Sequence, residues 1–205
     1  MTYLKIAIQK SGRLNEDSLN LLKECGISIN NGADQLMAQA SNFPLEVLYL
    51  RNSDIPQYVR DGVADIAILG ENTEIEKRTG NRQVLPLGFS RCRVSMAVPR
   101  DVPYEGLSYF QGKKIATSYP NTLSDFLKRE GIQAEIHEIS GSVEIAPGIG
   151  LAHAIFDIVS SGSTLFKNGL KEVHKVLDSQ AVLLANPDLS PEKQALLDQL
   201  VFRIK

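Results

Sequence analysis

Polar and apolar positions along the chain follow two different spacings, which predicts strands and helices in turn. Apolar runs that end in polar loops, such as 4–8 and 155–159, are typical of strands buried in a sheet. Elsewhere the apolar residues recur at helical spacing, as at Leu19, Leu22 and Cys25. Because the two kinds of segment alternate, we expect an α/β fold with a mostly parallel sheet.

The same order of elements occurs twice. Asn15 is expected to cap a helix that Gly26 ends, and Asn121 precedes a second helix whose end at Gly131 has a similar sequence. Three pairs of similar segments carry the repeat: 5–10 and 114–119, 21–27 and 126–132, 65–70 and 157–162. We therefore expect two similar lobes whose strand ends carry loops into a shared central cleft.

Two long apolar-alternating runs, 84–98 and 173–185, lie between the repeated halves. We expect them to be the two crossings of the chain between the lobes. The predicted division is lobe I at residues 1–90 plus 176–205, and lobe II at residues 91–175.

The last predicted element is an amphipathic helix. Ser190 followed by Pro191 is typical of a helix start, with proline at the first helical position. The apolar face that we expect to pack on lobe I consists of Leu196, Leu197, Leu200 and Val201.

Composition and charge exclude several classes of protein. The formal net charge is -2 and the pI is near 6.0, without a long basic cluster, which argues against binding to duplex nucleic acid. Cys25 and Cys92 have no disulfide or zinc-ligand spacing, so we expect a reducing, cytoplasmic setting. The apolar runs are too short to span a membrane or to form a secretory leader, so we expect neither export nor membrane insertion.

Ser160–Thr164, here called the serine-rich turn, is the main candidate for phosphate binding. The sequence predicts a short helix from about Leu151, then the strand 155–159, then this turn. Small residues let several backbone N–H groups and hydroxyls approach one phosphate. Asp157, just before the turn, can accept hydrogen bonds from sugar hydroxyls or hold a hydrated Mg²⁺. The alternative is an ordinary loop, since many such turns bind nothing.

A second candidate site is cationic. Lys10 and Arg13 lie in the loop after the first strand, with Gly12 between them, where the backbone can approach a polyphosphate closely. The alternative is a solvated surface turn. Arg51 also follows a strand, ahead of a helix that we expect to be well capped, so it is a plausible third cation for the cleft.

Other polar residues leave two interpretations open. Strand alternation sends Arg91 and Arg93 to one face, which we expect to meet the cleft. Tyr119 can stack on a purine or simply pack in the core. Glu71, directly after Gly70, can read an exocyclic amine or cap the next helix. The histidines show no nucleophile or metal arrangement, so the chemistry is expected to depend on positioned charge.

Six segments, in order, resemble ATP phosphoribosyltransferases: QKSGRL at 9–14, DGVAD at 61–65, GEN at 70–72, ATSYP at 116–120, GSVEIAP at 141–147 and SGSTL at 161–165. The resemblance implies a two-lobed fold like that of type II periplasmic binding proteins. It also implies a reaction that joins N1 of the adenine of ATP to C1 of phosphoribosyl pyrophosphate (PRPP), releasing pyrophosphate with help from Mg²⁺. This is the first step of histidine biosynthesis.

The resemblance also implies roles for individual residues. Ser160, Ser161, Gly162, Ser163 and Thr164 would hold the 5-phosphate, Asp157 and Glu144 the ribose side, and Lys10, Arg13 and Arg51 the polyphosphates. Tyr119, Gly70 and Glu71 would lie near the adenine, and Asp157 would hold Mg²⁺ through the substrate. Arg93 completes the expected substrate-binding set.

The motif sequences are similar to those of the long form of this family. The chain resembles the catalytic region of that form without its C-terminal regulatory domain. The family implies a homo-oligomer, a dimer or a hexamer, with a regulatory domain or subunit. Two residues depart from most members, His153 where an acidic residue is usual and Gln35 near a usual basic residue. The first departure puts in doubt a ribose or metal role at position 153, and the second suggests that one expected cation near the leaving group is missing or supplied elsewhere.

Two other functions remain as alternatives from the residues. The same fold serves non-catalytic solute-binding or effector-sensing modules, and fold alone does not separate them from an enzyme. A phosphoribosyltransferase for another base would keep the serine-rich turn and change the surroundings of Tyr119 and Glu71.

Overall fold

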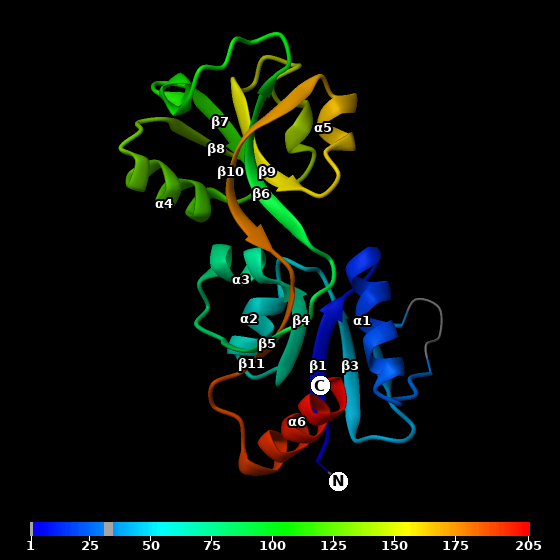
Figure 1. The fold of residues 1–205 in the computed structure, drawn as a ribbon. Coiled ribbons are helices and arrows are strands. Elements are labelled where there is room, and N and C mark those ends of the chain that lie inside the picture. Colours follow the sequence, from blue (N-terminus) through cyan, green and yellow to red (C-terminus); the bar gives the residue numbers. More distant parts are fainter. Residues whose placement is uncertain (1, 31–34) are drawn as a thin grey trace. The chain divides into compact units, whose positions relative to one another are not determined.

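A computed structural model describes residues 2–30 and 35–205 and divides the chain into two compact units (Figure 1). Unit 1 comprises Met1–Ser90 with Gln180–Lys205, and unit 2 comprises Arg91–Ser179. The second crossing lies at Ser179, not at Lys175, because strand β10 (Leu170–Ser179) stays paired with its neighbour β6 to its last residue. The central cleft stays a prediction.

Unit 1 is built on a mixed sheet in the order β2-β3-β1-β4-β11-β5. Its strands are β1 (Leu4–Gln9), β2 (Met37–Gln39), β3 (Leu45–Leu50), β4 (Ile66–Gly70), β5 (Arg82–Pro86) and β11 (Ala181–Ala185). Its helices are α1 (Arg13–Glu24), α2 (Ile55–Arg60), α3 (Glu71–Lys77) and α6 (Pro191–Ile204). Helices α1 and α6 contribute to the apolar cluster on one face of the sheet, and α2 to the cluster on the other face.

Unit 2 is built on a second sheet in the order β10-β6-β9-β7-β8. Its other strands are β6 (Cys92–Pro99), β7 (Lys114–Thr117), β8 (Glu135–Glu138) and β9 (Ala154–Val159). Its helices are α4 (Pro120–Glu130) and α5 (Ser163–Lys167), with 3-10 turns η1 (Leu107–Phe110) and η2 (Val143–Ile145). Helix α4 packs in one apolar cluster, and α5 with η2 in the other.

The predicted repeat is confirmed by the sheet topology. Strands β3-β1-β4-β11 of unit 1 and β8-β7-β9-β6 of unit 2 have the same order and directions, three parallel strands with an antiparallel fourth. The helices after β1 and β7 also end alike, with a left-handed glycine at Gly26 (φ 73) and Gly131 (φ 68). The amide of Ile27 donates to Leu22 O at 3.0 Å, and that of Ile132 to Leu127 O at 2.9 Å.

One of the three predicted segment pairs, 65–70 with 157–162, is out of register in the structure. The backbone N–H of Asp65 donates to Lys5 O at 2.9 Å, and the equivalent bond in unit 2 runs from His153 to Lys114 O at 2.8 Å. The counterpart of Asp65 is therefore His153, and Asp157 lies four positions further along its strand. The two segments share an Asp-Ile pair, but this likeness in sequence does not make the residues equivalent. The hydrogen bonds between neighbouring strands decide which residues correspond.

Two predicted helix features are also wrong. Helix α1 begins at Arg13 with Gly12 at the capping position, and Asn15 instead donates from Nδ2 to Gln9 O at 2.7 Å. The helix expected from Leu151 is absent from the described residues at that place: η2 ends at Ile145 and a turn leads into β9. Proline and left-handed glycine in the segment 147–150 oppose a continued helix.

The C-terminal helix matches its prediction. Ser190 Oγ accepts a hydrogen bond from Lys193 N at 3.3 Å, and α6 begins at Pro191. Leu197 and Leu200 are fully buried in the unit 1 core. Helix α6 is also tied to the start of β4, because Lys193 Nζ lies 2.7 Å from Asp65 Oδ1. No helix among the described residues is both long and apolar enough to cross a membrane.

Candidate functional site

The carboxyl ends of three parallel strands gather the cationic candidates in unit 1. Strands β3, β1 and β4 are neighbours, so their ends meet at one edge of the sheet. Lys10 follows β1, and its backbone N donates to Leu50 O, the last residue of β3, at 2.8 Å. Arg51 follows directly, and Gly70 and Glu71 lie at the end of β4. The edge therefore brings together Lys10, Arg51 and the Gly70–Glu71 turn.

The loop between β1 and α1 holds its cations in solvent. Gly12 has φ 86, a left-handed conformation that favours glycine. Gln9 Nε2 donates to Ser11 O at 2.8 Å and so ties the loop to the end of β1. Lys10 is exposed, and the Arg13 side chain is 77% exposed, with its Nε 3.7 Å from Asp17 Oδ2. Both cations are accessible to an anionic ligand.

The turn at the end of β4 is crowded. A Cβ on Gly70 would lie 2.6 Å from Asn72 Oδ1, so a larger residue requires Asn72 to move. Glu71 begins α3, is half-buried, and its backbone N donates to Gln180 O at 2.9 Å. Asn52 Nδ2 donates to Thr73 Oγ1 at 2.9 Å and fixes the segment after Arg51 against α3. Glu71 is thus the first residue of α3, whose capping position is Gly70 and has no side-chain capping bond, so the structure does not bear out the capping interpretation and a ligand role stays a prediction.

In unit 2, most of the predicted sugar-phosphate residues line one cavity of about 130 Å³. The lining residues are Glu144, Asp157, Ile158, Val159, Ser160, Ser161, Gly162, Thr164 and Leu165. They come from η2, from the end of β9, and from the turn and first residues of α5. Segments more than ten residues apart in the chain therefore converge on one small polar hollow.

The serine-rich turn is shorter than predicted, because α5 begins at Ser163. Gly162 has φ 82 and its carbonyl accepts from Phe166 N at 3.0 Å, which starts the helix. Ser161 Oγ donates to Ser163 Oγ at 3.0 Å and accepts from Ser163 N at 3.3 Å. Ser163 thus braces the turn from within, while Thr164 lines the cavity from the first turn of the helix.

The electrostatics of the cavity favour a neutralising ligand. Burial raises the pKa of the Asp157 carboxyl to about 6, and the nearby charge of Glu144 adds to the rise. A hydrogen bond at 2.8 Å from Ile158 N to Asp157 Oδ1 acts in the opposite direction. Two carboxylates that share a small hollow can be satisfied by hydroxyl donors or by a cation.

Arg93 is placed beside the serine-rich turn, but its guanidinium is already bonded. Its Nε and Nη2 donate to the two carboxylate oxygens of Glu172 at 2.6 and 2.5 Å, and its Nη1 donates to Ser160 O at 2.9 Å. Ser95 Oγ also donates to Glu172 Oε1 at 2.7 Å. The bond from Arg93 lowers the pKa of Glu172. Sequence reasoning missed Glu172 and Ser95, because strand alternation says nothing about which partner an arginine reaches.

Tyr119 directly precedes α4, and its ring packs against the apolar cluster around Phe126. Its backbone N donates to Thr117 Oγ1 at 2.8 Å. The packing interpretation of Tyr119 is thus confirmed in part, and stacking on a purine stays a prediction.

The two residues that depart from the family pattern have different positions. His153 is exposed and precedes β9, outside the residues that line the cavity, and its Nδ1 accepts from Lys114 N at 3.0 Å. Gln35 is exposed, and its neighbour Asp34 lies outside the described residues. His153 therefore binds the first backbone N–H of β7.

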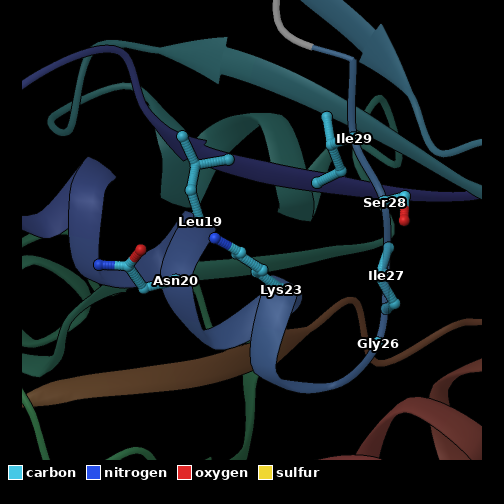
Figure 2. Close-up of a pocket in the computed structure, with 7 residues that line it drawn as sticks. All are labelled: Leu19, Asn20, Lys23, Gly26, Ile27, Ser28 and Ile29. Atoms are coloured by element: carbon cyan, nitrogen blue, oxygen red, sulfur yellow. The ribbon is translucent and has the colours of Figure 1, made fainter.

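A larger cavity, of about 360 Å³, lies elsewhere in unit 1 (Figure 2). Figure 2 shows that it lies between α1 and the segment that follows this helix. Its lining consists of Leu19, Asn20, Lys23, Gly26, Ile27, Ser28 and Ile29. None of these residues belongs to the predicted site set, and the lining carries a single charged side chain, that of Lys23. Size alone does not make it the candidate site, and the smaller cavity of unit 2 has the more specific chemistry.

The chain matches the family model described as HisG: ATP phosphoribosyltransferase over residues 51–205. It is 60% identical over 203 residues to the ATP phosphoribosyltransferase of Cytophaga hutchinsonii, covering 99% of this chain and 71% of that protein. Its fold matches that of the ATP phosphoribosyl transferase (HisG:HisZ) complex from Thermotoga maritima with a TM-score of 0.81 and 28% identity, over 98% of each chain.

A substrate-binding protein of an amino acid ABC transporter matches with a TM-score of 0.63 and 12% identity, covering 99% of this chain and 92% of that one. At this identity the likeness shows the fold alone, and it confirms the predicted type II periplasmic-binding-protein-like architecture. High identity along nearly the whole chain, together with the family model, shows that this chain belongs to the ATP phosphoribosyltransferase family.

Proposed function

We propose that the chain joins N1 of the adenine of ATP to C1 of PRPP by dividing the task between its two units. The cavity of unit 2 holds the ribose 5-phosphate part of PRPP, and the cations of unit 1 hold the polyphosphates. The observation that supports this division is the convergence of Glu144, Asp157 and the serine-rich turn on one cavity. The reaction is the first step of histidine biosynthesis.

The serine-rich turn binds the 5-phosphate. Ser160, Ser161 and Gly162 have small side chains, so the backbone N–H groups of the turn can approach an anion closely. The hydroxyls of Ser161 and Thr164 supply further donors. The left-handed Gly162, φ 82, lets the chain reverse into α5 within this short span.

Asp157 and Glu144 bind the ribose side. In their ionised forms the two half-buried carboxylates accept hydrogen bonds from the ribose hydroxyls, which add to the bond that Asp157 already accepts from Ile158 N and offset the cost of burial. Their number also fits Mg²⁺, which keeps several waters and is commonly held by one or two carboxylates plus substrate phosphates. Bound in this way, Mg²⁺ would neutralise charge on the pyrophosphate.

Lys10, Arg13 and Arg51 stabilise the departing pyrophosphate. The bond between C1 of the ribose and the pyrophosphate oxygen breaks and its electron pair leaves with pyrophosphate, while the lone pair of adenine N1 forms the new bond to C1. Positive charge develops on the ribose and negative charge on the leaving group. Fixed cations lower the barrier at the leaving group, and held ribose and adenine keep the reacting atoms aligned. A side-chain nucleophile is not required.

Tyr119, Gly70 and Glu71 are the proposed neighbours of the adenine. Glu71 offers a carboxylate acceptor for the exocyclic amine, and Gly70 offers a backbone that a planar base can approach. Tyr119 is half-buried and packs against the core of unit 2, and we propose that the exposed part of its ring stacks on the base.

We also propose that the chain acts in the cytoplasm as part of a larger assembly. Homo-oligomers, as dimers or hexamers, and association with a regulatory domain or subunit are expected for the family. The Thermotoga maritima structure is of a HisG:HisZ complex, which supports a regulatory partner for this chain.

The proposal is tested by incubating the protein with ATP, PRPP and Mg²⁺ and following the ultraviolet absorbance of N1-ribosylated adenine. PRPP binding is measured in parallel by calorimetry. We expect product formation and PRPP binding. Folded protein that binds an anionic ligand without forming product would favour the binding-module alternative, which the identity to curated enzymes does not favour.

A further inference from the structure

The carbonyl of Ser160 is held from outside the cavity. Strand β9 ends at Val159, which pairs with Arg93 on the neighbouring antiparallel strand β6. From this position the Arg93 side chain extends past the end of β9, and its Nη1 donates to Ser160 O at 2.9 Å. The first peptide of the serine-rich turn is therefore fixed by a side chain of another strand.

Glu172 in turn fixes Arg93. It lies on β10, on the other side of β6, and binds the guanidinium through both carboxylate oxygens at 2.6 and 2.5 Å. Ser95 Oγ adds a bond to the same carboxylate at 2.7 Å. A bidentate arginine–carboxylate pair has one preferred geometry, so the guanidinium has little freedom to swing. The network connects β10, β6 and the end of β9.

This network acts through geometry more than through charge. The Arg93 and Glu172 charges cancel, so the pair adds little net positive potential for a phosphate. Three of the five guanidinium N–H groups are engaged in the bonds to Glu172 and Ser160. A peptide unit is planar and trans, so its N–H points away from its C=O. Holding the carbonyl of Ser160 therefore also sets the direction of the Ser161 N–H.

We propose that Arg93 and Glu172 are positioning residues for phosphate binding: they fix the Ser160–Ser161 peptide so that its N–H is ready for the 5-phosphate of PRPP. The inference rests on the proposed function, since it assumes that the serine-rich turn receives that phosphate. It assigns Arg93 to the support of the turn, in place of the direct substrate contact expected from strand alternation.

The test compares Arg93→Lys and Glu172→Gln with the wild-type protein. Arg93→Lys keeps the positive charge and loses the bidentate guanidinium geometry. Glu172→Gln keeps the shape of the side chain and loses its negative charge. Calorimetry with ribose 5-phosphate and with pyrophosphate separates the phosphate turn from the cations of unit 1. We expect each variant to bind ribose 5-phosphate roughly 10-fold more weakly, the usual effect of losing a bond to a charged group. Pyrophosphate affinity and the KM for ATP should stay within about twofold.

The sign of the Glu172→Gln effect is decisive. If Arg93 bound the phosphate directly, removal of the competing carboxylate would free its charge and tighten ribose 5-phosphate binding. If the network positions the turn, both single variants weaken binding, and the Arg93→Lys/Glu172→Gln double variant is little worse than either one. Tighter binding in Glu172→Gln, or two independent losses that add, would overturn the proposal.

Asp178→Asn is the matched control. Asp178 is on the same strand and pairs in register with Arg93, yet its carboxylate bonds Lys175 Nζ at 2.7 Å on the surface. This variant should leave ribose 5-phosphate affinity unchanged.

In the Arg93 and Glu172 variants, equal losses for ribose 5-phosphate and pyrophosphate, with a lower melting temperature, would indicate a purely structural role. Wild-type protein that forms product but does not bind ribose 5-phosphate would overturn the inference, whereas absence of both product and PRPP binding would reject the proposed function itself.

Discussion

The ends of two equivalent strands differ between the units. In unit 1, β4 ends at Gly70 and α3 begins at the next residue. In unit 2, β9 ends at Val159, and Ser160–Gly162 intervene before α5 begins at Ser163. These extra residues line the cavity that we assign to ribose 5-phosphate. The shared scaffold therefore carries a phosphate turn in one copy and a direct strand-to-helix junction in the other.

A second difference lies within the strands. Because Asp65 and His153 occupy equivalent positions, Leu69 of β4 corresponds to Asp157 of β9. Leu69 is fully buried in an apolar cluster. Asp157 follows the buried Ile155 on the same face of β9 and is itself at the cavity. One position thus contributes to stability in unit 1 and is expected to serve chemistry in unit 2.

The largest effect is expected when Asp157 is given the identity of its counterpart. Asp157→Leu removes a hydroxyl acceptor and a potential Mg²⁺ contact, and kcat/KM should fall roughly 1,000-fold, at the upper end for loss of one preorganised electrostatic group. Steady-state kinetics with PRPP measures it. The variant should remain folded, as judged by circular dichroism. Activity within tenfold of wild type would contradict the proposed ribose contact.

Arg13→Ala tests the other unit. The side chain is exposed and assigned to the leaving group, so its loss should lower kcat roughly 100-fold, about 3 kcal/mol of transition-state stabilisation. PRPP affinity should change less than kcat, because the interaction strengthens as charge develops. Parallel calorimetry and kinetics provide the comparison. An equal loss in both quantities would mean that Arg13 only anchors the substrate.

The pH dependence of the free energy of unfolding should show how much the buried Asp157 carboxylate destabilises the protein. Its pKa is raised from 3.8 to about 6, so the folded state keeps a proton that the unfolded chain has already released. The contribution of this carboxyl to the free energy of unfolding is therefore highest below about pH 4, falls as the pH rises to about 6, and is level above that. With a discount for partial exposure, the fall should be about 2 kcal/mol.

Denaturant titrations at several pH values measure this contribution as the difference between wild type and Asp157→Asn. The variant should lack this part of the fall and gain stability near pH 7 relative to wild type. Identical pH profiles for the two proteins would show that Asp157 keeps an ordinary pKa.

Effects on stability alone are expected at the equivalent residues that directly precede β4 and β9, and the smaller of them at His153. Asp65 is buried, accepts from Lys5 N at 2.8 Å and pairs with Lys193, so Asp65→Ala should cost about 2 kcal/mol or more. His153 makes the matching bond from an exposed position, and His153→Ala should cost about 1 kcal/mol. His153→Asp restores a carboxylate acceptor and should stay near wild type. Thermal unfolding tests this order, and a larger loss at His153 would contradict it.

Much of the fold could be predicted because it depends on local pattern. The apolar runs, the glycine-ended helices and the Ser190–Pro191 start of α6 each have a physical reason within a few residues of sequence. Glycine at the ends of α1 and α4 is needed for a left-handed backbone, so the two halves share a visible signature. The two similar α/β lobes followed from the order of these elements, whereas the type II architecture was implied by the family resemblance.

The rest depends on contacts that no short segment specifies. The bond between Glu172 and Arg93 joins residues 79 positions apart, and it was not predictable from the alternation of either strand. Strand register likewise decided that His153, and not Asp157, is the counterpart of Asp65. The site residues of unit 2 were named from the turn chemistry and the resemblance, and the cavity places most of them together.

The position of β11 has a consequence for how the protein is made. Unit 1 joins two separate stretches of chain, and β11 lies inside its sheet, between β4 and β5. During synthesis β5 has no partner until residues 181–185 leave the ribosome, whereas unit 2 is one continuous stretch made before them. Unit 1 is therefore the first to be started and the last to be completed. A nascent chain that stalls before β11 leaves the edge of the apolar strand β4 unpaired.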